Sequence, residues 1–180
     1  RLRCDWSSDV CSSDLIHTLR RLGIDGDVDV EDVRRLAKGH AARIFKEHYF
    51  VKPGIGALPK TLQASVFDMY VNAGSAAIRI LQRLLAQFGI PVSIDGILGP
   101  QTVAATNKTV DIAPDHFVDA YGIVHRNYYY NLAGRRVTSR KYVRSDDGGK
   151  GGWIKRAEEF TSRRFHLTIN EHNQKVMAWD

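Results

Sequence analysis

Two polar residues on one predicted helix have side chains suited to chemistry. Asp68 and Asn72 stand four residues apart, so a helix places both on the same face. A carboxylate and an amide on one face can bind a polar ligand, and Asp68 could also act as a general acid. The same pair can instead cap and link helices from inside the fold. Their spacing leaves both roles open.

A second polar group stands at the end of another predicted helix and consists of Glu47, His48 and Tyr49. Glu47 carries a carboxylate that could serve as an acid, and the wide apolar face of Tyr49 could stack on a sugar ring. Core packing accounts for Tyr49 equally well. A lone His48 is more typical of a structural histidine than of a ligand or a base.

Asp95, Gly96 and Thr102 belong to a turn motif, Asp-Gly-Ile-Leu-Gly-Pro-Gln-Thr, that covers residues 95–102. Its glycines permit tight turns, and Pro100 suits the first position of a following helix. Asp95 could bond backbone amides in a purely structural turn, or the motif could contact a ligand directly. Both alternatives stay open at this point.

An acidic run over residues 25–32 resembles half of a calcium loop. With Gly26 at the turn position, four Asp side chains fall where oxygen ligands are needed. The two earlier ligand positions fall on Arg21, which repels a cation, and Gly23, which has no side-chain oxygen. The run is therefore interpreted as the capped start of a helix, and neither a metal nor another cofactor is expected.

Helices must position these groups, because apolar residues recur at helical spacing through most of the chain. The expected helices cover 29–50, 58–73, 76–88, 100–107, 114–132, 153–160 and 169–179. A short extended piece is expected over 91–94, and a polar loop from Arg135 to Gly152. The predicted class is mainly α.

The predicted helix over 114–132 has one expected buried face. Its members are Phe117, Tyr121, Val124, Tyr128 and Leu132. The two tyrosines that follow Tyr128 would then point elsewhere, since three consecutive residues cannot share one face of a helix.

Composition indicates a folded, basic chain. Hydrophobic residues make up 43% of 180 residues, and the net charge is +6. The segment from Arg135 to Arg156 holds eight Lys or Arg and two Asp, a local charge of +6. Such a segment favours polyanions, although a solvated basic face is the simpler interpretation. Neither a membrane span nor a secretory signal peptide is expected.

Residues 1–15 look foreign to the rest of the chain. They lack a helical or strand period and contain the near-repeat Ser-Ser-Asp-Val and Ser-Ser-Asp-Leu. From Cys4 on they resemble the translation of a sequencing adaptor, and a genuine N-terminus is the alternative. Cys4 and Cys11 both lie here, so no disulfide framework or cysteine metal site is expected downstream.

Three groups of segments together carry a family resemblance. They are 65–74, then 80–85 with 94–102, then 121–130 with 148–153. In this order they resemble glycoside hydrolase family 108, the N-acetylmuramidases of phages and prophages, followed by that family's C-terminal peptidoglycan-binding region. The resemblance runs from about Ile16 to Trp179.

The resemblance implies a lysozyme-like helical domain over 16–76 and a small helical peptidoglycan-binding region over 77–180, with 1–15 set apart. Such enzymes protonate the glycosidic oxygen with a carboxylic acid whose pKa its surroundings raise. The family's presumed acid is a glutamate in an N-terminal Glu-Gly-Gly-Tyr segment. Ile16 to Arg20 resembles the tail of the hairpin that follows that segment. No Glu precedes Glu31 here, so the catalytic residue is unknown and the chain as it stands is expected to be inactive.

The resemblance also implies where the substrate would lie. Asp68 and Asn72 would orient the sugar or hold the catalytic segment, and Tyr49 would stack on a sugar ring. The turn formed by residues 95–102 would contact the cell wall. The expected partner is bacterial peptidoglycan, bound by a monomer without stable membrane insertion. An endolysin-like protein of this kind waits in the bacterial cytoplasm before release and then acts in the periplasm or cell wall.

Two other functions remain as alternatives. A non-catalytic peptidoglycan-binding module would adhere to the wall without cutting it. Tyr128–Tyr130 and Arg126 supply the aromatic and basic side chains that nucleic-acid binders use. That alternative predicts steeply salt-dependent DNA binding. Without a recognisable nucleic-acid motif, no nucleic-acid partner is expected.

Overall fold

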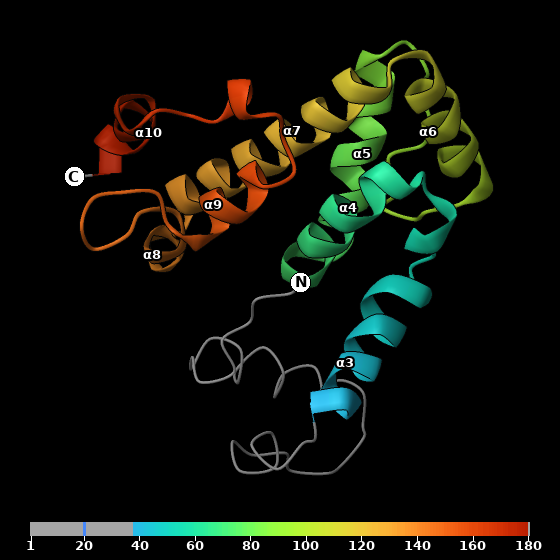
Figure 1. Ribbon diagram of the computed structural model, residues 1–180, viewed down its shortest axis with the longest axis horizontal. Coiled ribbons are helices and arrows are strands. Elements are labelled where there is room, and N and C mark those ends of the chain that lie inside the picture. Colours follow the sequence, from blue (N-terminus) through green and yellow to red (C-terminus); the bar gives the residue numbers. More distant parts are fainter. Residues whose placement is uncertain (1–19, 21–37, 180) are drawn as a thin grey trace. The chain divides into compact units, whose positions relative to one another are not determined.

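A computed structural model describes Arg20 and residues 38–179, and Figure 1 shows its helices. Within these residues no strand forms, and the class is mainly α, as predicted. The elements in order are α3 (Lys38–Lys46), η1 (Glu47–Val51), η2 (Ile55–Ala57), α4 (Lys60–Ala73), α5 (Ala76–Gln87), α6 (Pro100–Ile112), α7 (Pro114–Arg135), η3 (Val137–Ser139), α8 (Arg140–Val143), α9 (Gly152–Glu158), η4 (Arg163–Phe165), α10 (Ile169–Val176) and η5 (Met177–Trp179).

The chain divides into two compact units between Glu47 and His48. The described helix of the first unit is α3, which covers part of the predicted 29–50 helix and passes into the π-helical turn η1. The adaptor-like segment 1–15, the acidic run 25–32 and, apart from Arg20, the expected hairpin tail from Ile16 to Arg20 lie outside the described residues.

The second unit begins with a core built by α4, α5, α6 and the first half of α7. On α5 the apolar residues Ala77, Ile78, Leu81, Leu84 and Leu85 recur at helical spacing and are buried. Ser75 stands at the N-cap position of α5, yet its side chain makes no capping bond and its Oγ instead accepts a bond from Arg79. The buried members of this core are Ile55, Leu58, Leu62, Val66, Met69, Ala77, Ile78, Leu81, Leu84, Leu85, Ala105, Val110, Phe117 and Tyr121.

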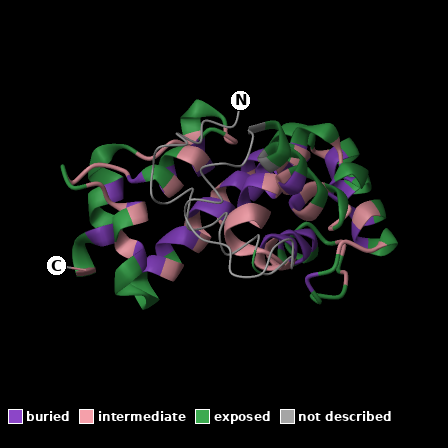
Figure 2. Cartoon of the chain, turned by 90° about the horizontal axis from the view of Figure 1, so that it is seen from below, coloured by how far each residue is buried: buried purple, intermediate pink, exposed green. Residues whose placement is uncertain are grey.

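Helix α7 runs from this first core into a second one, where it lies alongside α9 (Figure 1). The predicted face is right for Phe117 and Tyr121 and wrong beyond them, because Tyr129 and Tyr130 are buried while Tyr128 is half-buried. Steps of four residues lead from Tyr121 to Tyr129, and the elements that pack on the second half of α7 cover this side. Buried and exposed residues share the same helices in Figure 2, as amphipathic helices on a core require.

The second core is formed by the C-terminal half of α7 with α8, α9 and α10. Its buried members are Tyr129, Tyr130, Ala133, Val143, Ile154, Ala157 and Val176. The predicted loop from Arg135 to Gly152 is wrong in part, because it contains η3, α8 and a tight turn closed by an antiparallel bridge between Arg144 and Lys150. Val143 joins this segment to the second core, where its side chain is fully buried.

Candidate functional site

A buried polar cluster lies where α4, α7 and α9 meet. Asp68 on α4 is 6% exposed, and its Oδ1 accepts a hydrogen bond from the guanidinium of Arg156 on α9. His125 on α7 is fully buried, with its Nε2 3.9 Å from Asp68 Oδ2. Burial raises the pKa of Asp68, and the charge of Arg156 offsets part of that rise. The cluster therefore joins a carboxylate to a cation from a distant segment.

The surroundings of His125 keep its ring neutral. Burial, with a smaller contribution from the Arg156 charge, lowers the pKa of His125 to about 3. Neither ring nitrogen has a hydrogen-bond partner among the described residues. The His125 ring lies 4.9 Å from the ring of Tyr129 and 6.4 Å from that of Tyr121, centroid to centroid. It acts here as a packed aromatic ring.

Asn72 and Tyr49, two more of the predicted site residues, lie in the same unit. The Asn72 side chain donates to the backbone oxygen of Asp68 at 2.9 Å, so the two residues are linked along α4. Tyr49 is 8% exposed, and its ring meets the ring of Tyr70 edge-on at 6.5 Å. A sugar would therefore reach little of the Tyr49 face in this arrangement.

The Asp95 turn is organised by one buried side chain, Gln82 of α5. The Gln82 amide nitrogen lies 2.8 Å from Asp95 Oδ1, 3.1 Å from the Ile97 carbonyl and 3.3 Å from Thr102 Oγ1. The Gln82 oxygen accepts a bond from the Gly96 amide at 2.9 Å. Asp95, Gly96 and Thr102 are thus brought together around a residue that is 1% exposed.

Gly96 and Asp95 complete this turn locally. Gly96 has a φ of +79°, and a Cβ there would lie 3.0 Å from the guanidinium carbon of Arg79, so glycine suits the position best. Asp95 Oδ1 also accepts from the Ile97 amide at 2.8 Å. The bonds from Gln82 and Ile97 lower the pKa of Asp95. The turn presents Ile97 outward, with 66% of its surface exposed.

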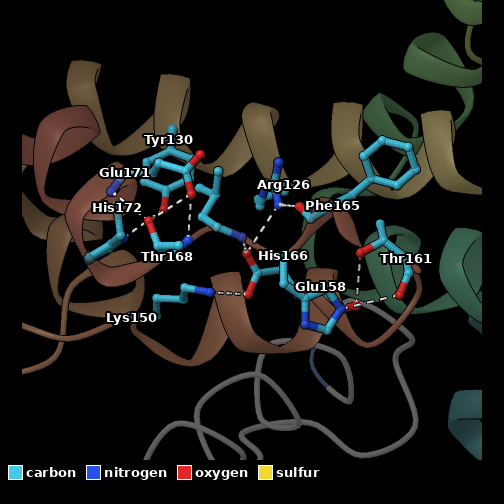
Figure 3. Close-up of polar contacts among 11 residues, drawn as sticks. Arg126, Tyr130, Lys150, Glu158, Thr161, Phe165, His166, Thr168, Glu171 and His172 are labelled. Carbon is cyan, nitrogen blue, oxygen red and sulfur yellow. Dashed lines mark hydrogen bonds and ion pairs between the residues drawn. The ribbon is translucent and has the colours of Figure 1, made fainter. Parts of the chain in front are cut away.

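A third polar group, shown in Figure 3, fastens the C-terminal segment to α7 and α9. Glu158 Oε1 accepts from Arg126 at 3.1 Å and from the Leu167 amide at 2.8 Å, while its Oε2 accepts from Lys150 at 2.5 Å. Arg126 also donates to the Phe165 carbonyl at 2.6 Å. This group has a structural role, because all its members bond one another or the backbone.

Sequence reasoning identified Asp68, Asn72 and the Asp95 turn but missed Gln82, His125 and Arg156 as their partners. A signal existed for two of them. Gln82 interrupts the apolar stripe of α5, and His125 stands midway between Tyr121 and Tyr129 in steps of four. For Arg156 no local signal exists, since it is one of many basic residues in its segment.

The described residues do not group three or more His, Cys, Asp or Glu side chains in a way that could hold a metal ion. The two carboxylates considered as candidate acids, Glu47 and Asp68, differ in burial. Glu47 is exposed, and Asp68 is buried against Arg156. No helix in the described ranges has the length and hydrophobicity that a membrane span requires.

Comparison with known proteins gives two adjacent family matches. Residues 15–74 match the family glycosyl hydrolase 108, and residues 76–158 match the family described as a predicted peptidoglycan domain. The solved structure of Brucella abortus SagA shares the fold with a TM-score of 0.55 and 24% identity, over 84% of this chain and 80% of that one. No curated protein gives a significant match.

Proposed function

We propose, from the premise that this chain joins a glycosyl hydrolase 108 segment to a predicted peptidoglycan domain, that it acts on bacterial peptidoglycan. The parent activity would be that of an N-acetylmuramidase. The order of the two matched segments, hydrolase first and wall-binding second, carries this proposal. An endolysin-like role, with release from the cytoplasm to the periplasm or wall, fits the same reasoning.

The contacts between the two matched segments support a joint role. Asp68 lies in the hydrolase segment and Arg156 in the peptidoglycan segment, and they form an ion pair. The first core likewise draws Leu62, Val66 and Met69 from one segment and Leu81 and Tyr121 from the other. The part of the hydrolase segment that lies in the second unit and the peptidoglycan segment thus share one core, and we propose that they act on the same substrate.

Cleavage of the glycan requires a carboxylic acid that stays protonated near neutral pH and reaches the glycosidic oxygen. Asp68 is buried and paired with Arg156, so we assign it a positioning role between the two segments. The chain contains no Glu-Gly-Gly-Tyr segment, which is where the family resemblance places the acid. We therefore expect the chain as it stands to bind peptidoglycan without cutting it.

The substrate contacts are proposed residue by residue. Hydrogen bonds hold the Asp95 turn, with Gly96 and Thr102, in one conformation, and Ile97 is exposed on it. We propose that this turn contacts the wall. We propose that Asn72 and Tyr49 support the sugar-binding region from inside the fold. Tyr49 does not stack on a sugar in this proposal, because its side chain is buried. A monomer without a nucleic-acid partner is part of the same proposal.

The test uses purified peptidoglycan and two measurements, the release of new reducing ends and the fraction of protein that pellets with the wall. We expect pelleting without release. Release would show that the acid is among the residues present and that the assignment of Asp68 must be reconsidered. Binding to DNA with indifference to peptidoglycan would refute the proposed function.

A further inference from the structure

Two hollows flank the tight turn that joins Arg144 to Lys150 at the C-terminal end of the molecule. One has a volume of about 720 Å³ and is bordered on its far side by α10. The other has a volume of about 450 Å³ and is bordered by α9. Asp147, Gly149 and Ile169 line both, so the hollows form one groove around the turn.

The turn between them is preformed. The Ser145 amide donates to the Gly149 carbonyl at 2.9 Å, and the Gly151 amide donates to the Val143 carbonyl at 2.7 Å. Asp147 Oδ1 accepts from the Ser145 hydroxyl at 2.5 Å and from the Gly149 amide at 3.0 Å. Because these bonds hold the turn in the free protein, a ligand would enter the groove without first ordering it.

Charges of both signs line the smaller hollow. Glu158 forms ion pairs with both Lys150 and Arg126, as Figure 3 shows. Lys155 and Glu159 are exposed, and neither forms an ion pair with a described residue. Asp147 is also exposed, and the hydrogen bonds from Ser145 and Gly149 lower its pKa, so it stays ionised near neutral pH. The exposed charged side chains of this hollow are thus one cation, Lys155, and two carboxylates, Asp147 and Glu159.

The larger hollow has a different lining. Asn170, Asn173 and Gln174 on α10 contribute side-chain amides, which both donate and accept hydrogen bonds as peptide groups require. Ile169 and Met177 are 54% and 72% exposed and add apolar surface. A ligand with backbone amides and small apolar side chains would match this lining.

The lining of the groove is poor in aromatic rings. Of the residues that line the two hollows, only His166 carries a ring. Trp153, the nearest large aromatic residue of α9, has stacked rings on both faces, Tyr129 at 4.6 Å and Tyr142 at 4.7 Å. A sugar that binds by stacking therefore finds no open aromatic face in this groove.

We propose that the groove around Asp147 binds the stem peptide of peptidoglycan rather than its glycan strand. A stem peptide with a diamino acid carries an ammonium group, free carboxylates, amides and alanine methyl groups. Lys155 would take a carboxylate, Asp147 and Glu159 the ammonium group, and the amides of α10 the peptide backbone. This inference rests on the proposed function and names the part of the wall that the groove around Asp147 recognises.

The experiment compares pelleting of the full chain with two substrates, diaminopimelate-type peptidoglycan and the same material stripped of stem peptides by an amidase. We expect pelleting with the intact wall and its loss with the stripped wall. Equal pelleting with both would overturn the inference and leave the proposed function standing. Pelleting with neither would refute the proposed function itself, and the inference with it.

Variants then test the location. Lys155→Ala should raise the dissociation constant for the intact wall about tenfold, the effect of one lost charge-assisted bond, and Asn173→Ala about fivefold, the effect of one lost neutral bond. Lys108→Ala on α6 removes an exposed lysine far along the sequence and should change it less than about twofold. Far-ultraviolet circular dichroism checks that each variant folds. Folded Lys155 and Asn173 variants that bind like the parent would overturn the assignment of the groove.

Discussion

At the scale of single residues, His125 has a protonation behaviour far from that of an exposed histidine. Its ring is fully buried beside Asp68, Arg156 and two tyrosines, and its pKa falls to about 3. The unfolded chain protonates the same ring near pH 6.5, so protons favour the unfolded state between these two values. The contribution of His125 to the free energy of unfolding is therefore fully present above about pH 6.5 and is lost as the pH falls.

We predict that His125→Phe reduces the loss of stability in mild acid. In the parent protein, His125 alone should lower the free energy of unfolding by about 2 kcal/mol between pH 7 and pH 5. Phenylalanine keeps the aromatic packing and removes both unpartnered nitrogens. Urea denaturation at the two pH values measures the difference. Equal losses in parent and variant would contradict the depressed pKa.

Gln82 supports the second prediction at this scale, because its one amide holds Asp95, Gly96 and Thr102 in place. We predict that Gln82→Ala lowers the free energy of unfolding by about 2 kcal/mol, since buried partners lose their bonds. Gln87→Ala, an exposed position on the same helix, is the matched control and should cost less than about 0.5 kcal/mol. Similar effects of both substitutions on the denaturation midpoint would argue against the role of Gln82.

At the scale of elements, the junction between the tight turn and α9 depends on close backbone contact. A Cβ at Gly151 would lie 2.4 Å from the Tyr142 carbonyl oxygen, which is backbone and cannot swing away. At the next residue, Gly152, a Cβ would meet nothing within 4 Å. Two adjacent glycines thus have opposite tolerance for a side chain.

We predict that Gly151→Ala destabilises the protein by about 2–4 kcal/mol through overpacking. Gly152→Ala should be neutral or slightly stabilising, because alanine favours the first turn of α9 over glycine. Thermal denaturation of the two variants under identical conditions gives the comparison. A Gly151→Ala variant that melts with the parent would show that the turn and α8 do not pack as described.

At the scale of the whole molecule, the first core crosses the boundary between the two family segments. The domain boundary predicted at residues 76 and 77 stays a prediction about sequence organisation. The packing shows that α4, from before this boundary, shares its buried side chains with α5 and α7, from after it. A fragment that starts after α4 would expose the apolar surfaces that Leu62, Val66 and Met69 cover.

We predict that a fragment of residues 76–180 lacks a cooperative unfolding transition, while the full chain shows one. Loss of three buried apolar side chains costs several kcal/mol, comparable with the total stability of a small domain. Near-ultraviolet circular dichroism and urea titration of both proteins provide the measurement. A sigmoidal transition in the fragment would mean that the peptidoglycan segment folds without α4.

The sequence by itself determined the helical class and most helix positions, because hydrophobic spacing, Pro100 and Pro114 at helix starts, and the turn residues act over a few positions. It also predicted that Asp95, Gly96 and Thr102 form one turn. These features are local, because each depends on residues that are close together in the sequence.

Only the tertiary structure decided which partners the polar residues meet. Arg156 reaches Asp68 across 88 positions in the sequence, and the burial of Tyr129 depends on α8 and α9 packing against α7. The segment after Arg135 reads as a polar loop, yet burial of Val143 and close contact at Gly151 fold it into a helix and a tight turn. Such contacts depend on how distant elements pack together, and hydrophobic spacing within one element carries no information about that packing.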